Sequence, residues 1–89
     1  MPDSGNILTK SGELSEVTSW YYRRKKKYLP GRFEVRFQIA WANTQSPDAL
    51  ADAKLRLAGK NFVIHHVYRV DQWDKQDIEA YCIAYEVEE

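Results

Sequence analysis

His65, His66 and Cys82 carry the side chains best suited to catalysis or metal binding. Neighbouring residues on a strand point to opposite faces, so the two imidazoles are not expected to chelate one metal ion together. A single cysteine can form neither an intramolecular disulfide nor a cysteine-based zinc site, which favours a reducing, cytoplasmic location. A nucleophilic pair of Cys82 with a histidine stays open, but no flanking motif supports it. We therefore predict a protein that is not an enzyme and has no metal site and no cofactor.

Asp71, Asp74 and Asp77 are acids spaced along one polar stretch, an arrangement that could in principle bind Ca²⁺. The stretch lacks the glycine and the final bidentate glutamate of an EF-hand loop. The four scattered glycines form no phosphate-binding motif either. We expect residues 71–77 to be a solvated loop.

Basic and aromatic residues gathered between positions 20 and 36 give the strongest functional signal. This segment, the basic-aromatic hairpin, holds seven basic side chains and one acid, whereas residues 70–89 hold seven acids and one lysine. Interleaved aromatic and basic residues suit phosphates and stacked bases, or the groove of a protein partner. The alternative is a solvated hairpin tip that protects an edge strand from aggregation. The predicted partner-binding residues are Trp20, Tyr21, Tyr22, Arg23, Arg24, Lys25, Lys26, Lys27, Tyr28, Arg32 and Arg36.

The overall composition indicates one neutral globular domain. The chain has 89 residues, of which 44% are hydrophobic and 29% charged, with thirteen basic residues balancing thirteen acids. Zero net charge excludes a polyanionic nucleic-acid mimic and a uniformly basic coat protein. Whether the two charged segments are separated in space depends on strand order, because the last strand could lie beside the basic one and neutralise it. No stretch resembles a secretory signal or a membrane span, so we expect no membrane association.

Periodicity predicts the elements that position these residues. We expect residues 1–12 to be a flexible segment or a short edge strand, and residues 13–89 to be a single domain. Strands are predicted over 17–28 and 33–42, joined by a type II turn at Pro30-Gly31. A second hairpin is predicted from strands over 62–70 and 78–87.

A helix is predicted between the two hairpins, from Pro47 to about Ala58. Ser46 would cap it, Asp48 would favour its first turn and Gly59 would end it. Ala49, Leu50, Ala53 and Leu57 would then face the sheet. A second apolar patch, a possible dimer or second interface, would consist of Ala51, Leu55 and Ala58. The alternative for this patch is a set of scattered exposed alanines with one leucine.

The expected fold is therefore α+β, in the order ββαββ, with one roughly four-stranded mixed or antiparallel sheet and a single helix packed on one face. A right-handed crossover would place strands 33–42 and 62–70 parallel to each other. An exposed final strand could pair across a two-fold axis, a second reason to expect a possible homodimer.

The strand–helix–strand pattern resembles that of very small phage and mobile-element proteins, including inhibitors of host RNA polymerase and anti-CRISPR proteins. It runs from Phe33-Glu34-Val35 to Ala42, through Ser46-Pro47-Asp48-Ala49-Leu50-Ala51, and on to Phe62-Val63-Ile64. The resemblance implies a non-enzymatic inhibitor on a host nucleic-acid machine, with the basic hairpin and the acidic end as docking surfaces. It carries over no functional residue, and the aromatic-basic segment before Phe33 departs from the pattern.

Two function hypotheses follow. The first is a small, non-catalytic, cytoplasmic interaction protein that docks onto a protein or ribonucleoprotein partner. The alternative is a DNA- or RNA-binding protein that uses the basic-aromatic hairpin as a β-ribbon.

Overall fold

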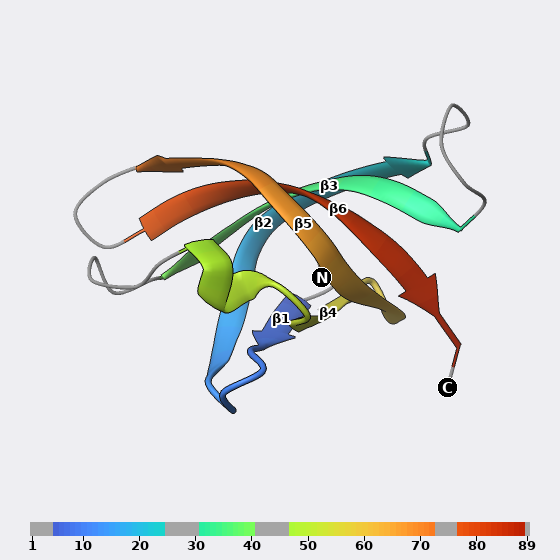
Figure 1. The fold of residues 1–89 in the computed structure, drawn as a ribbon, viewed down its shortest axis with the longest axis horizontal. Coiled ribbons are helices and arrows are strands. Elements are labelled where there is room, and N and C mark those ends of the chain that lie inside the picture. Colours follow the sequence, from blue (N-terminus) through green and yellow to red (C-terminus); the bar gives the residue numbers. More distant parts are fainter. Residues whose placement is uncertain (1–4, 25–30, 41–46, 73–76, 89) are drawn as a thin grey trace.

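The computed structural model describes residues 5–24, 31–40, 47–72 and 77–88, and these residues form a small β-barrel (Figure 1). The strands close in the order β1-β2-β3-β6-β5-β4, and every neighbouring pair is antiparallel. A short 3-10 helix, η1, precedes β4. The elements are β1 (Gly5–Leu8), β2 (Leu14–Arg24), β3 (Arg32–Ala40), η1 (Pro47–Leu50), β4 (Lys54–Leu57), β5 (Lys60–Gln72) and β6 (Asp77–Val87).

The barrel interior is filled by large side chains from β3 and small ones from β6. Phe33 lies opposite Ala84 in the β3–β6 register, and Phe37 lies opposite Ala80. All four side chains are buried. The small residues of β6 leave the volume that the β3 phenyl rings occupy, so the two strands together fill the interior without overpacking.

The short strands β1 and β4 close the barrel. Gly5 of β1 lies so close to β4 that a Cβ atom there would sit 2.7 Å from Leu57 Cδ2 and 3.0 Å from the Arg56 carbonyl oxygen. Only glycine lets the two backbones approach this closely. β2 and β5 each have one edge next to a central strand, β3 or β6, and one outer edge. The pairing on the outer edge ends at Val17 in β2 and at Ile64 in β5, and no described strand pairs with these edges farther along. Figure 1 shows β2, β3, β6 and β5 extending past this closed region as long, twisted arms.

The structure confirms the two predicted hairpins. β2 pairs with β3 from Val17–Ile39 to Arg24–Phe33, and Gly31 before β3 has a φ of 83°, as the predicted turn requires. β5 pairs with β6 along almost its whole length. The alternation predicted for the strand from residue 33 is also present, although residues 41 and 42 lie outside the described residues.

The predicted helix from Pro47 to Ala58 is wrong. Only Pro47–Leu50 is helical, as a single 3-10 turn, and Asp52 has a φ of 63°, which an α-helix does not tolerate. From Ala53 the chain alternates buried and exposed side chains as strand β4. Gly59 does not end a helix: with Ala58 it forms the two-residue turn between β4 and β5, at φ values of 77° and 52°.

The α+β class is therefore also wrong. β3 and β5 do run in the same direction, as predicted for strands 33–42 and 62–70, because each is antiparallel to β6; β6 lies between them, so they are not paired with each other. The protein is an all-β barrel, and β5 is antiparallel to both of its neighbours, β4 and β6. A parallel pair needs a long crossover connection, usually a helix. Here β4 takes up the residues that such a helix would need and turns back into β5 through a tight hairpin.

The basis for the predicted dimer face is removed in the same way. Leu55 is 1% exposed and belongs to the core, so it does not share a surface with Ala51 and Ala58. β6 lies between β3 and β5, so it has no free edge with which to pair across a two-fold axis.

No helix in the described part of the chain has the length and apolar character needed to cross a membrane.

Candidate interaction surface

The side chains that β2 contributes to the basic-aromatic hairpin point to two opposite faces of the strand. A register shift between Val17 and Ser19 sets the alternation, after which Trp20 and Tyr22 point toward the core. Their rings stack with centroids 5.6 Å apart, and Tyr22 also contacts Phe62 at 5.2 Å. Trp20 and Tyr22, two of the four aromatic residues predicted to bind a partner, therefore pack against the core instead. Among the predicted binding residues, Lys25, Lys26, Lys27 and Tyr28 lie outside the described residues.

The other half of the hairpin contributes to a continuous outer surface, which we call the Tyr–Arg face. It spans the outward side chains of β2, β3, β6 and β5, four strands that are neighbours in the barrel. Its members are Tyr21, Arg23, Arg32, Glu34, Arg36, Gln38, Tyr68, Arg69, Asp71, Glu79, Tyr81 and Tyr85.

Tyrosine and arginine alternate across the centre of the Tyr–Arg face. Tyr21 of β2 lies opposite Arg36 of β3. Arg36 in turn lies opposite Tyr81 of β6, which faces Arg69 of β5. The guanidinium carbon of Arg36 is 5.6 Å from the centroid of the Tyr21 ring, and that of Arg69 is 4.9 Å from the Tyr81 centroid. Cation–π attraction thus holds the side chains of this row in place.

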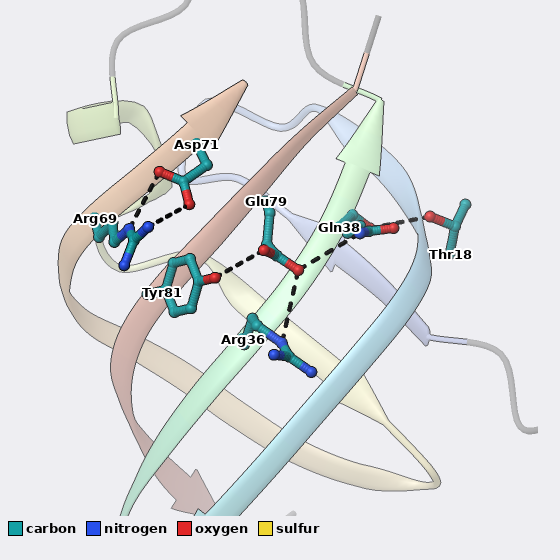
Figure 2. Close-up of polar contacts among 7 residues, drawn as sticks. All are labelled: Thr18, Arg36, Gln38, Arg69, Asp71, Glu79 and Tyr81. Atoms are coloured by element: carbon teal, nitrogen blue, oxygen red, sulfur yellow. Dashed lines mark hydrogen bonds and ion pairs between the residues drawn. The ribbon is translucent and has the colours of Figure 1, made fainter. Parts of the chain in front are cut away.

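Glu79 connects the central row to the next row of the face (Figure 2). Its carboxylate accepts hydrogen bonds from the Tyr81 hydroxyl at 2.8 Å and from Gln38 Nε2 at 3.5 Å. Arg36 Nε lies 3.6 Å from the same carboxylate. In the same row as Glu79, Asp71 pairs with Arg69 at 2.9 Å. Acids of the segment 70–89 therefore neutralise Arg36 on β3 and Arg69 on β5.

Glu34 organises the opposite side of the face. Its carboxylate lies 3.1 Å from Arg23 Nε and accepts a hydrogen bond of 3.3 Å from the Tyr68 hydroxyl. Tyr68 lies at a register shift in β5: Val67 before it and Arg69 after it pair with residues of β6, and Tyr68 itself does not. Its side chain reaches over β6. The exposed fractions of Tyr21 and Tyr68 are 52% and 47%, so both rings are available to a partner.

Arg32 lies near the end of the face. Its Nη2 donates a hydrogen bond of 2.7 Å to the Tyr85 hydroxyl, and its guanidinium lies over the Tyr85 ring at 4.7 Å.

The Tyr–Arg face also holds a hollow of about 240 Å³ between Tyr21, Glu34 and Tyr81, bounded by two arginines. A hollow of this size can receive a single side chain.

Tyr68 and Tyr81 are neutral hydrogen-bonding groups of this face. The hydrogen bond to Glu79 raises the pKa of Tyr81 above its ordinary value. Burial, the charge of Glu34 and the hydrogen bond to it raise the pKa of Tyr68. Both effects favour the protonated phenol, so each hydroxyl stays a donor at physiological pH.

The structure separates the reactive side chains. Cys82 points into the barrel and is fully buried, whereas His65 and His66 are exposed on its outside. The His65 ring contacts Tyr85 at 5.1 Å. No cluster of three histidine, cysteine or acidic side chains that could hold a metal ion occurs within residues 5–24, 31–40, 47–72 and 77–88.

The Cys82 thiol should make the stability of the protein fall at alkaline pH. Burial raises its pKa to about 12, whereas in the unfolded chain the thiol ionises near pH 8.5 to 9. Above that pH the unfolded state binds fewer protons, so the free energy of unfolding decreases with pH. Between pH 8 and pH 10 the wild type should lose about 1 to 2 kcal/mol more than Cys82→Ala in urea titrations. Equal losses in the two proteins would contradict a buried neutral thiol.

Sequence reasoning predicted only four of the twelve residues of the Tyr–Arg face as binding residues: Tyr21, Arg23, Arg32 and Arg36. Tyr68, Arg69, Glu79, Tyr81 and Tyr85 come from the second hairpin, which we expected to contribute only negative charge. Alternation did place Tyr81 and Tyr85 on one side of their strand, and that was the available signal. The pairing of β3 with β6 was needed to bring this side next to the arginines.

Comparison of the chain with known protein families, with curated proteins and with solved structures yields no match. The resemblance to small phage and mobile-element proteins stays a prediction, but the helix of its strand–helix–strand pattern is not formed, because residues 47–58 contain a 3-10 turn and strand β4.

Proposed function

We propose that this protein is a small, non-catalytic interaction module that docks onto a protein partner through the Tyr–Arg face. The observation that carries the proposal is the cross-strand row of alternating tyrosine and arginine, which begins at the exposed ring of Tyr21 and has the exposed ring of Tyr68 beside it. Tyrosine and arginine are among the residues that contribute most binding energy at protein interfaces. Tyrosine offers a large contact area and loses little side-chain entropy on binding.

Charge pairing favours a protein over a nucleic acid as the partner. Arg23, Arg36 and Arg69 each lie within 4 Å of a carboxylate of the same face. A phosphate backbone would have to displace these carboxylates and would still be repelled by them. A protein surface with charges of both signs complements the face without this cost.

Inhibition of the partner is the most specific form of this role. The preformed Tyr–Arg face supports it, in place of the strand–helix–strand pattern on which the expected inhibitor role was based, and a cytoplasmic location fits a chain with one cysteine. A compact domain that presents a preformed surface can block a partner without catalysis, because its binding is not opposed by the ordering of a flexible segment.

Direct nucleic-acid binding is the second candidate. Arg23 and Arg24 are the last two residues of β2. Lys25, Lys26 and Lys27 follow them in the sequence and lie outside the described residues. Arg24 makes a cation–π contact with Phe33 at 5.5 Å but no ion pair with a described residue. Binding here would lose close to one log unit of affinity per log of salt for each phosphate contacted.

Site-specific photo-crosslinking tests the protein-docking proposal. A benzophenone amino acid replaces Tyr21 in one protein and Lys10, an exposed residue outside the face, in a control. After nuclease treatment of a lysate of the native host, we expect a discrete protein adduct at position 21 and none at position 10. The double variant Tyr21→Ala, Tyr68→Ala should then bind the identified partner at least about thirtyfold more weakly, the effect of one interface hot spot.

Two outcomes would contradict this proposal. Adducts that disappear after nuclease treatment, with binding that weakens steeply in salt, would assign the role to a nucleic acid. Equal binding of the double variant and the wild type, with unchanged unfolding temperatures, would remove the Tyr–Arg face from the interaction.

A further inference from the structure

A second surface lies outside the two short strands that close the barrel. Here β2, β1, β4, β5 and β6 form two cross-strand rows on the outside. One row runs from Leu14 through Leu8 and Lys54 to Val63. The other contains Asn6, Arg56, Asn61 and Val87. These side chains line a groove of about 350 Å³.

The groove presents apolar side chains to solvent. Leu14 is 72% exposed, Val87 39% and Leu8 37%. These three residues are all the large aliphatic side chains that are exposed among the described residues. Scattered exposed leucines are ordinary, but aliphatic residues that gather in one hollow are typical of a binding site.

Two cationic side chains lie in the same cross-strand rows as these apolar side chains. Lys54 and Arg56 alternate on the outer side of β4, and neither makes an ion pair with a described residue. On the same hairpin Lys60 lies 3.9 Å from Glu86, and the arginines at the centre of the Tyr–Arg face have carboxylate partners. Within the row of Arg56 the nearest acid on the β2 side is Glu16, two strands away. The groove is therefore a positively charged site in a protein of zero net charge.

Asn6 and Asn61 flank Arg56 on the neighbouring strands. Each side-chain amide offers two N–H donors and a carbonyl acceptor. This is the complement of a peptide group, so an extended chain lying across the row could be held by both amides.

We propose that this groove binds an extended acidic peptide segment that carries one large aliphatic side chain. The aliphatic side chain would lie against Leu8 and Leu14, and its acidic neighbours would pair with Lys54 and Arg56. Charge complementarity selects an acidic segment. The groove exposes no aromatic ring on which a base could stack, so it does not suit a single-stranded nucleic acid. The site is separate from the Tyr–Arg face, and the proposal does not depend on the function of that face.

Titration of the isotope-labelled full chain with a defined peptide tests the proposal. The probe is an acetylated and amidated pentapeptide, Asp-Glu-Leu-Glu-Asp. We expect dissociation constants in the millimolar range. Chemical shifts should change at the side-chain amides of Asn6 and Asn61 and at the methyl groups of Leu14. The double variant Lys54→Gln, Arg56→Gln should weaken binding about two- to tenfold, the effect of two exposed ion pairs, whereas Lys10→Gln should not.

Matched probes decide whether the proposal stands. A peptide with serine in place of leucine, and one with lysines in place of the acids, should each bind more weakly than the probe. Equal binding of either control peptide, shifts confined to the Tyr–Arg face, or no shift at about 10 mM probe would overturn the proposal. Binding of phosphatidylglycerol vesicles through Lys54 and Arg56, without binding of the peptide, would also overturn it by assigning the groove to a membrane surface.

Discussion

Leu55→Asp is expected to unfold the protein, whereas Arg56→Asp leaves it folded. Leu55 is 1% exposed and points into the core, while Arg56, its neighbour on β4, is exposed. An aspartate at position 55 would be a buried carboxylate without a partner, which costs several kcal/mol. That cost is comparable with the total stability of about 5 to 13 kcal/mol expected for a domain of this size. Circular dichroism and the dispersion of amide resonances distinguish the two outcomes.

The predicted helix gives the opposite expectation for the same pair of residues. In that helix Leu55 would lie on the outward patch with Ala51 and Ala58, where an acid is tolerated. A folded Leu55→Asp protein would therefore contradict the register of β4. Leu55→Ala provides a milder variant that should stay folded and lose about 2 to 5 kcal/mol in a denaturant titration.

The sequence carried enough information to predict the four long strands β2, β3, β5 and β6, but not strand β4 or the strand order. In β3 every second residue is apolar over the full length of the strand, and such a long alternation has one reading. The two predicted hairpins follow from local turn chemistry and from the strands on either side. Pairing of β3 with β6 joins residues between 37 and 53 positions apart, and nothing local specifies it.

The helix was mispredicted because two periods fit the same residues. Ala49, Leu50, Ala53 and Leu57 match one helical face, whereas Ala53, Leu55 and Leu57 match a strand. Short apolar runs cannot be assigned from periodicity alone. The strand prevails here because β1 and β5 pair with both sides of β4, a tertiary effect that intrinsic propensity does not include.

Strand order also brings the basic and acidic segments of the chain together. The basic and acidic segments are far apart in sequence, but β6 lies directly beside β3. Arg36 from the basic segment thereby meets Glu79 from the acidic one. The opposite charges thus form one mixed surface on these strands, and the proposal of a protein partner rests on this mixture.

Phe62→Ala is expected to remove about 3 to 5 kcal/mol of stability. Phe62 is 1% exposed, and its ring lies 5.2 Å from Tyr22 and 5.4 Å from Phe33, so it links β5 to β2 and β3 through the interior. No described strand pairs with β2 beyond Val17 on this side, so ring packing replaces backbone pairing there. Urea titration followed by tryptophan fluorescence measures the loss, because Trp20 stacks on Tyr22.

Phe62→Leu is the matched control and should cost less, because leucine keeps most of the buried apolar volume. The same pair of variants links the core to the Tyr–Arg face, because Tyr21 and Tyr22 are neighbours on β2 and point to opposite sides of it. When Phe62 is truncated, Tyr22 loses its support and the orientation of Tyr21 on the outer face becomes less fixed. Binding by the Tyr–Arg face should therefore weaken in Phe62→Ala even where the protein is still folded. A loss below about 1 kcal/mol would show that the aromatic contact does not hold β2 against β5.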